Sequence, residues 1–61
     1  MIRCYMDFYG NTATIRQALT GEWIVYIDLF GGIRKTRYTL RAAKKVLRSI
    51  SYGWREVSRV G

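Results

Sequence analysis

The chain has 61 residues, a formal net charge of +7 and an apolar fraction of 49%. A chain of this length forms a single domain that buries only about 60% of the surface its unfolded form exposes. Its apolar content is too high for a disordered tail, and no run approaches the roughly 18 apolar residues of a membrane span. The composition therefore predicts one folded domain with a small core.

The first residues and the cysteine content predict a cellular setting. The opening MIRCYMDFYG contains neither a long apolar segment nor a small-residue cleavage site, so we expect no signal peptide. Cys4 has no second cysteine in the chain, which excludes an intramolecular disulfide. Together these features predict a cytoplasmic protein in a reducing compartment, without a membrane partner.

Basic residues are concentrated in one segment. Eleven Lys and Arg face four Asp and Glu overall, and residues 34–48 hold seven of the basic side chains and no acid. Such a cluster attracts phosphate backbones, anionic lipid surfaces or acidic proteins. The charge pattern favours nucleic acid as the partner, and a merely solvated basic face is the alternative.

Two strands are predicted in the first third of the chain. Residues 2–9 alternate with a two-residue period and are rich in aromatics, which is typical of a strand. Gly10-Asn11 tolerates positive φ and predicts a tight hairpin turn. Residues 12–19 form a second run with several β-branched side chains, and residues 20–22 make the next turn.

The third and fourth strands are predicted to form a glycine-linked hairpin. Residues 23–30 (WIVYIDLF) alternate between a wholly apolar face and a mixed face. Gly31-Gly32 matches a two-residue hairpin loop, because glycine adopts the left-handed backbone that such turns need. Residues 33–38 return as a strand with three basic side chains. These short connections predict an antiparallel meander.

One amphipathic helix follows the strands. Thr39 is a suitable N-cap, and the apolar residues after it recur at helical spacing. The opposite arc of the helix is a secondary basic face, formed by Arg41, Lys44, Lys45 and Arg48. Gly53 suits the turn after the helix. Residues 54–61 fit a short helix, a strand or an ordered extension equally well.

These elements predict an α+β fold: a three- to four-stranded antiparallel β-meander with the helix packed on one face. Residues 12–50 form the sheet-plus-helix unit, residues 1–11 add an N-terminal strand and turn, and residues 51–61 form a C-terminal extension. The predicted core comprises Ile15, Trp23, Val25, Ile27, Leu40, Ala43, Val46, Leu47 and Ile50. The open face of the sheet is predicted to carry Thr14, Arg16, Ile24, Tyr26, Asp28, Lys35 and Arg37.

A longer pattern covers residues 13–49. It contains an Ile-Arg strand, a turn ending in Gly-x-Trp, an alternating strand, a glycine turn, a basic strand and a Thr-capped helix. The residues that carry it are Ile15-Arg16, Gly21-Glu22-Trp23, Val25, Ile27, Gly31-Gly32, Arg34-Lys35, Thr39 and Ala43. With them the chain resembles the arm-type DNA-binding domain of phage tyrosine integrases and, more distantly, the plant ethylene-response-factor type of DNA-binding domain.

This resemblance implies a three-stranded sheet that enters the major groove of DNA, with the helix packed behind it. These 61 residues contain no counterpart of a recombinase catalytic domain, so the resemblance does not extend to DNA cleavage. The candidate nucleic-acid-binding residues are Arg16, Tyr26, Arg34, Lys35 and Arg37. Asp28 also falls on the implied DNA-facing side, but we expect it to pair with Arg16 or Arg37 across the strands.

Catalytic and metal-binding chemistry lacks its usual residues. The chain has no histidine, its only cysteine has no evident base, and its four acids are scattered. We therefore expect no enzymatic activity, no metal and no cofactor.

The sequence thus predicts a small basic DNA-binding protein of phage or mobile-element type, acting as a recombination accessory or small regulator through an open β-sheet face. One alternative is a basic inhibitor or adaptor that binds an acidic protein surface, and another is an RNA-binding protein. Exposed strand edges would also allow a homodimer.

Overall fold

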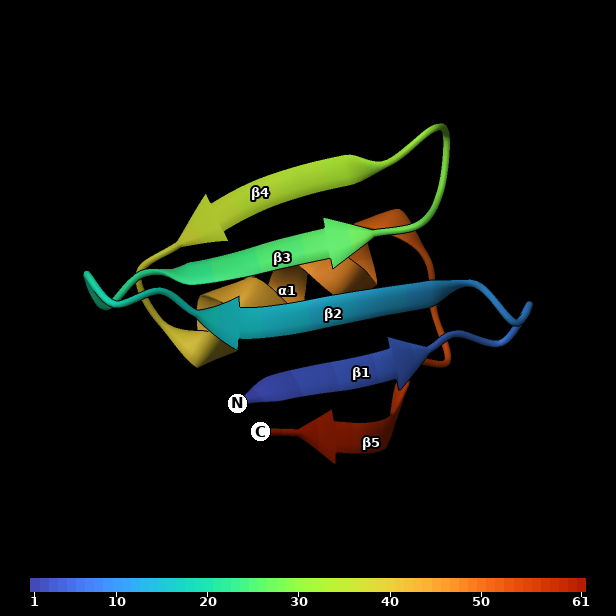
Figure 1. Ribbon diagram of the computed structural model, residues 1–61. Helices are drawn as coiled ribbons and strands as arrows, with labels where there is room; N and C mark the ends of the chain where they lie inside the picture. The colour runs from blue at the N-terminus through green and yellow to red at the C-terminus, as the bar shows by residue number, and fades with distance from the viewer.

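The computed structural model describes residues 1–61 and shows a five-stranded antiparallel sheet with one helix on one face (Figure 1). The elements are β1 (Ile2–Met6), β2 (Thr12–Gln17), β3 (Trp23–Ile27), β4 (Ile33–Arg37), α1 (Leu40–Ile50) and β5 (Arg55–Val60). The strand order is β4-β3-β2-β1-β5, so the first four strands form a meander. The predicted α+β class and meander are confirmed.

The C-terminal residues, for which the sequence allowed three conformations, form the strand β5. It pairs antiparallel with β1, with Ile2 opposite Val60, and a register irregularity falls between Cys4 and Tyr5. The pairing brings the two chain ends side by side (Figure 1). It also moves one edge of the sheet from β1 to β5, so the two free edges are β4 and β5.

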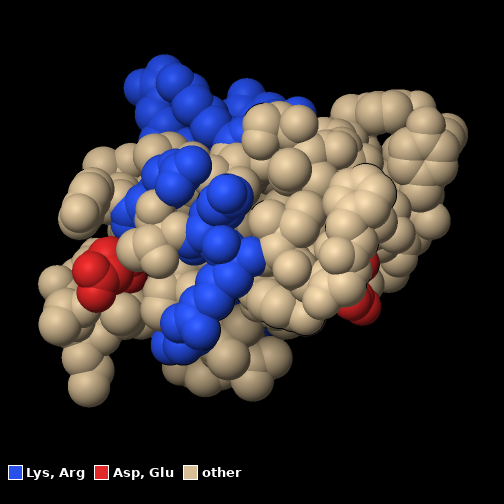
Figure 2. All heavy atoms as spheres, turned by 90° about the horizontal axis from the view of Figure 1, so that it is seen from above, with Lys and Arg blue, Asp and Glu red and all other residues tan.

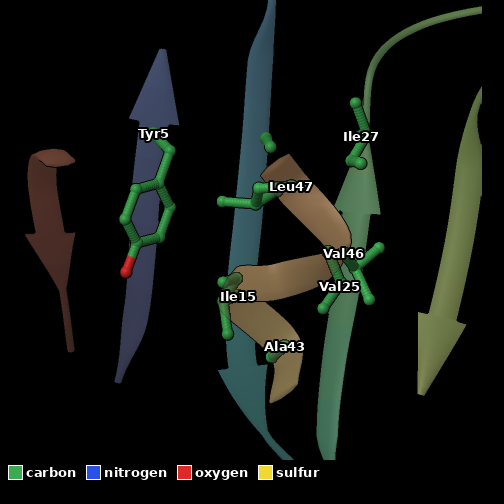
Figure 3. Packing of buried hydrophobic residues seen from close by; sticks show 8 residues of the cluster. Tyr5, Ile15, Val25, Ile27, Ala43, Val46 and Leu47 are labelled. Atoms are coloured by element: carbon green, nitrogen blue, oxygen red, sulfur yellow. The ribbon is translucent and has the colours of Figure 1, made fainter. Parts of the chain in front are cut away.

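The core lies between α1 and the middle of the sheet (Figure 3). Six of the predicted core residues are buried: Ile15, Val25, Ile27, Ala43, Val46 and Leu47. The other three, Trp23, Leu40 and Ile50, are half-buried and pack against this cluster. Tyr5 and Ala13 are also buried, although the sequence did not predict them as core. They lie opposite each other in the β1–β2 register, on the face that α1 covers.

The boundaries of α1 follow from its caps. The Ala42 N–H donates to Thr39 Oγ1 at 3.1 Å, which confirms Thr39 as the N-cap. The Ser51 N–H donates to the Leu47 carbonyl at 3.1 Å and closes the last turn. With only eleven residues and a basic arc, α1 does not meet the length and apolarity that a membrane crossing requires.

The β3–β4 connection is longer than the predicted two-residue turn. β3 ends at Ile27 rather than Phe30, so the loop contains residues 28–32. Three consecutive residues in it have positive φ: Phe30 at 52°, Gly31 at 82° and Gly32 at 107°. The prediction failed because alternation of apolar residues continues to Phe30, although the chain has already left the sheet.

This longer loop sets the register of β4. A two-residue loop would pair Phe30 with Ile33, whereas in the structure Ile33 pairs with Ile27, three residues further back along β3. Side chains alternate between the faces of a strand, so a shift by an odd number moves every β4 side chain to the opposite face.

The predicted positions of Lys35 and Arg37 on the open face are therefore wrong. Lys35 lies opposite Val25 and Arg37 opposite Trp23, on the side of the sheet that α1 covers. Arg34 takes the open face instead. The other predicted open-face strand residues, Thr14, Arg16, Ile24 and Tyr26, are paired with one another across β2 and β3 as expected.

A buried carboxylate organises the β1–β2 turn and joins it to the end of α1. Asp7 is 1% exposed and accepts hydrogen bonds from the backbone N–H groups of Tyr9 (2.9 Å) and Asn11 (2.7 Å). The side chains of Asn11 (2.9 Å) and Ser51 (2.7 Å) donate to its other oxygen. Burial alone would raise the pKa of Asp7, but these hydrogen bonds outweigh it and hold that pKa below its ordinary value of 3.8.

Asp7→Asn should lower the melting temperature at pH 7 by at least about 5 °C, because an amide cannot accept all of these hydrogen bonds. The variant should also differ in how far its melting temperature falls at acid pH. The carboxyl of Asp7 has a higher pKa in the unfolded state than in the folded state, so it is protonated in the unfolded state first as the pH falls. The stabilisation from Asp7 is therefore present above pH 3.8 and is lost as the pH falls below it. Thermal unfolding between pH 7 and pH 2 should show a smaller acid loss in the variant. An equal fall of the melting temperature in the variant and the parent would contradict this role of Asp7.

Gly53, after α1, has a φ of 75°, and a Cβ on it would lie 2.8 Å from Phe8 Cβ and 3.2 Å from the Phe8 backbone nitrogen. Gly31 has a similar φ of 82° but open space around it. Gly31→Ala should therefore cost only the left-handed backbone penalty of about 1–2 kcal/mol. Gly53→Ala should cost about 1–3 kcal/mol more, because the Phe8 backbone must move. Urea unfolding of both variants measures this difference, and equal costs would contradict the close contact.

Candidate nucleic-acid interface

The basic side chains of residues 34–48 lie on two consecutive elements, the edge strand β4 and the helix α1. We call this group the basic band, and it consists of Arg34, Lys35 and Arg37 on β4 and Arg41, Lys44, Lys45 and Arg48 on α1. Figure 2 looks onto the β4 edge, with the helix side at the top and the open face at the bottom. Lys and Arg atoms extend across this view from top to bottom, and acidic atoms lie only toward its two ends.

The β4 part of the basic band occupies both sides of a free edge strand. Arg34 projects to the open face opposite Tyr26, and Lys35 and Arg37 project to the helix side. Arg34 and Lys35 are exposed, and Arg37 is half-buried with its guanidinium donating to the Thr36 carbonyl at 2.8 Å. A ligand lying along this edge would therefore meet positive charge from both faces.

The four basic residues of α1 lie in two different environments. Arg41 and Lys45 are exposed on the outer surface of α1. Lys44 and Arg48 instead line a groove between α1 and β5. The secondary basic face predicted from the sequence thus exists as a helix surface, but only part of it is free of the neighbouring strand.

The open face of the sheet carries fewer of the predicted contacts than expected. Arg16 is exposed there, and Tyr26 is 45% exposed. The Tyr26 ring lies over the loop, since a Cβ on Gly32 would come 2.7 Å from its hydroxyl oxygen. Arg55 was not among the predicted site residues. It pairs with Met6 and adds a third arginine to this face. No periodicity in residues 55–60 marks that strand, so only the β1 pairing shows it.

The acidic residues do not neutralise the basic band. The only ion pairs join Glu56 to Arg3 (4.0 Å) and to Arg59, beside the opposite edge of the sheet. The Arg59 guanidinium holds the pKa of Glu56 below its ordinary value of 4.5, with Arg3 and Lys44 acting in the same direction. Nine of the eleven Lys and Arg, that is all except these two arginines, have no acidic partner.

The predicted cross-strand ion pair of Asp28 is wrong. Asp28 lies beyond the end of β3, is exposed and forms no ion pair with Arg16 or Arg37. Its backbone N–H donates to the Thr12 carbonyl at 2.9 Å. The prediction assumed that the strand continued to Phe30, which the β3–β4 loop rules out.

An exposed aromatic cluster at the β1–β2 turn was also missed. Phe8 stacks on Tyr52 with ring centroids 5.5 Å apart, and the hydroxyls of Tyr9 and Tyr52 are hydrogen-bonded at 2.9 Å. The three rings are between 57% and 68% exposed. Two aromatics just before the Gly10-Asn11 turn signal were visible in the sequence, but nothing placed Tyr52 beside them.

Cys4 is half-buried on the open face, opposite Thr14. No three side chains among Cys, Asp and Glu lie close enough together to hold a metal ion. Comparison with family models, curated proteins and solved structures finds no match to this chain.

Proposed function

We propose that this protein binds duplex DNA along the β4 edge of its sheet. The observation that carries the proposal is the basic band, in which seven Lys and Arg lie on adjoining elements without one ion pair. Positive side chains that meet phosphates release counterions from the DNA, and this release supplies much of the binding free energy.

The β4 edge suits a phosphate backbone. Its side chains alternate, so Arg34 reaches a bound strand from the open face and Lys35 from the helix side. Arg forks onto two phosphate oxygens, whereas Lys meets them as a point charge. The free edge also presents backbone N–H groups, which are common phosphate donors in protein–DNA contacts.

The resemblance to integrase arm-binding domains supports the choice of duplex DNA, with a changed docking. Insertion of the sheet into the major groove would use Lys35 and Arg37 on the open face, but they lie on the other side. On the open face only Arg34 adjoins the β4 edge and can reach base edges, and the rest of β4 contacts the phosphate backbone. Arg16, two strands away on β2, adds only long-range attraction. A role as a recombination accessory or small regulator of phage or mobile-element type belongs to the same proposal.

A basic surface that only contacts water, without a partner, explains the basic band less well than an anionic partner does. Arg41 and Lys45, and likewise Lys44 and Arg48, are like charges at i and i+4 on α1. Such pairs destabilise a helix by about 0.2–0.5 kcal/mol each. A net charge of +7 adds repulsion to a chain whose core is small. An anionic partner that supplies the missing counter-charge removes this cost.

Three double variants that each remove two positive charges test the docking. Arg34→Ala with Lys35→Ala should weaken duplex binding at least about tenfold and lower the slope of log affinity against log salt by about 1.8. Arg16→Ala with Arg55→Ala is the matched open-face control, and Arg41→Ala with Lys45→Ala is the matched helix control. Both should lose less, because only long-range attraction is removed. Fluorescence anisotropy with a duplex at several salt concentrations measures all three.

Equal losses in the three variants would show diffuse attraction and would contradict an edge site. A dominant open-face pair would restore insertion into the major groove. Parallel titrations with single-stranded DNA and RNA, and capture from nuclease-treated lysate, distinguish duplex DNA from RNA and from an acidic protein. A parent protein that fails to bind duplex DNA would overturn the proposal.

A further inference from the structure

A groove lies on the helix side of the sheet, between α1 and β5. It has a volume of about 680 Å³, which is within the range of small-molecule sites. Its floor is Tyr5 of β1, one wall is a stripe of α1 with Lys44, Leu47 and Arg48, and the other wall is formed by Trp54 and Glu56. The groove exists because α1 packs over β2 and β3 and leaves β1 and β5 beside it (Figure 3).

The floor of this groove holds an unsatisfied polar group. Tyr5 is only 6% exposed, and its hydroxyl is buried without a hydrogen-bond partner. Figure 3 shows its ring on β1, beside α1 rather than beneath it, at the margin of the core cluster to which it belongs. Buried hydroxyls are normally hydrogen-bonded, because burying one without a partner is costly. A polar ligand atom that displaces the side chains covering this hydroxyl would remove this cost.

One side of the groove attracts an anion. Lys44 and Arg48 are four residues apart on α1, so they lie on the same face of the helix, and neither forms an ion pair. Glu56 on the other wall is already paired with Arg59 and Arg3. Lys44 interacts with Glu56 at longer range and Arg48 has no acidic partner, so the groove keeps positive charge that is not engaged in an ion pair.

The groove also has a rigid apolar wall. The Trp54 indole N–H donates to the Leu47 carbonyl at 2.7 Å, which fixes the ring at the end of α1. Its only polar atom is satisfied by this bond, so the rest of the indole offers a flat apolar surface. Leu47 contributes further apolar surface from the helix.

We propose that this groove binds a small anion with a flat apolar body, of the class of aryl carboxylates and aryl phosphates. The anion lies against Lys44 and Arg48, the ring lies against Trp54, and a polar atom on the ring exchanges a hydrogen bond with the Tyr5 hydroxyl. The site is separate from the β4 edge and does not depend on DNA binding.

Matched probes test each part of this assignment. 4-Hydroxybenzoate and 4-hydroxyphenyl phosphate carry all three features, benzoate lacks the ring hydroxyl, and inorganic phosphate lacks the ring. A Trp23→Phe background leaves Trp54 as the only tryptophan, so its fluorescence and indole NMR signal report on the groove. We expect at least one hydroxylated aryl anion to bind with a Kd of about 1 mM or below, and inorganic phosphate to bind more weakly.

Tyr5→Phe keeps the ring and removes only the hydroxyl. It should weaken the hydroxylated anion about threefold to tenfold and leave benzoate unchanged. The unliganded variant should melt no lower than the parent, since it loses an unsatisfied group. Arg48→Ala and Lys44→Ala should each weaken both aryl anions about tenfold. Lys45→Ala, the neighbouring lysine outside the groove, is the matched control and should change affinity less than about twofold.

Absence of binding by both hydroxylated probes at millimolar concentration would overturn the proposal. So would equal losses for 4-hydroxybenzoate and benzoate in Tyr5→Phe, or equal losses in Lys44→Ala and Lys45→Ala. None of these outcomes depends on duplex DNA, so failure of the groove and failure of the β4 edge are distinguishable.

Discussion

A single helix is narrower than a five-stranded sheet, and the rest of this structure depends on that difference in width. An α-helix with its side chains is about 10–12 Å across, and strands are spaced about 4.8 Å apart. A single helix therefore covers two or three strands, and α1 covers the middle of the sheet. The outer strands on the helix side and the whole opposite face stay exposed to solvent. The basic β4 edge, the open face and the groove beside β5 all follow from this mismatch.

Asp7 allows the chain to close around so small a core. Its hydrogen bonds join the β1–β2 turn to Ser51 at the end of α1, two segments that are far apart in the sequence. Ser51 is also the residue from which the chain turns toward β5. A buried carboxylate with several donors is more directional than apolar contact, so it can fix the angle at which the chain leaves the helix. The pairing of β5 with β1 depends on that angle.

The sequence was informative wherever a residue's role follows from its immediate neighbours. The spacing from Leu40 to Ile50 predicted the helix and its buried side, because helical periodicity is local. The apolar alternation around Val25 predicted the inward side of β3 for the same reason. Roles that depend on distant pairing were not predictable. Tyr5 was not recognised as core, because the inward side of β1 depends on its pairing with β2 and not on its own pattern.

In the candidate site, too, local features were predictable from the sequence and features set by distant pairing were not. The basic segment was evident from charge alone, but the face on which Lys35 lies depends on the length of a loop. Glycine marked the place of the β3–β4 turn without giving its size, and one residue of positive φ, Phe30, is not glycine. An error of three residues in the register placed three of the five candidate residues on the wrong face of the sheet, all of them on β4. Such errors are most serious for surface sites, since a core face reveals its side by hydrophobicity and a charged strand does not.

The basic arc of α1 has two different uses, and this separates the two proposed sites. Arg41 and Lys45 face solvent and only add to the field around the β4 edge. Lys44, which is half-buried, and Arg48, which is exposed, line the groove together with Tyr5 and Trp54. Charge–charge interactions weaken strongly in open water and less in a partly enclosed groove. In the two proposed sites, the same residue types at helical spacing therefore have different roles: long-range attraction on one side of the helix and an anion contact on the other.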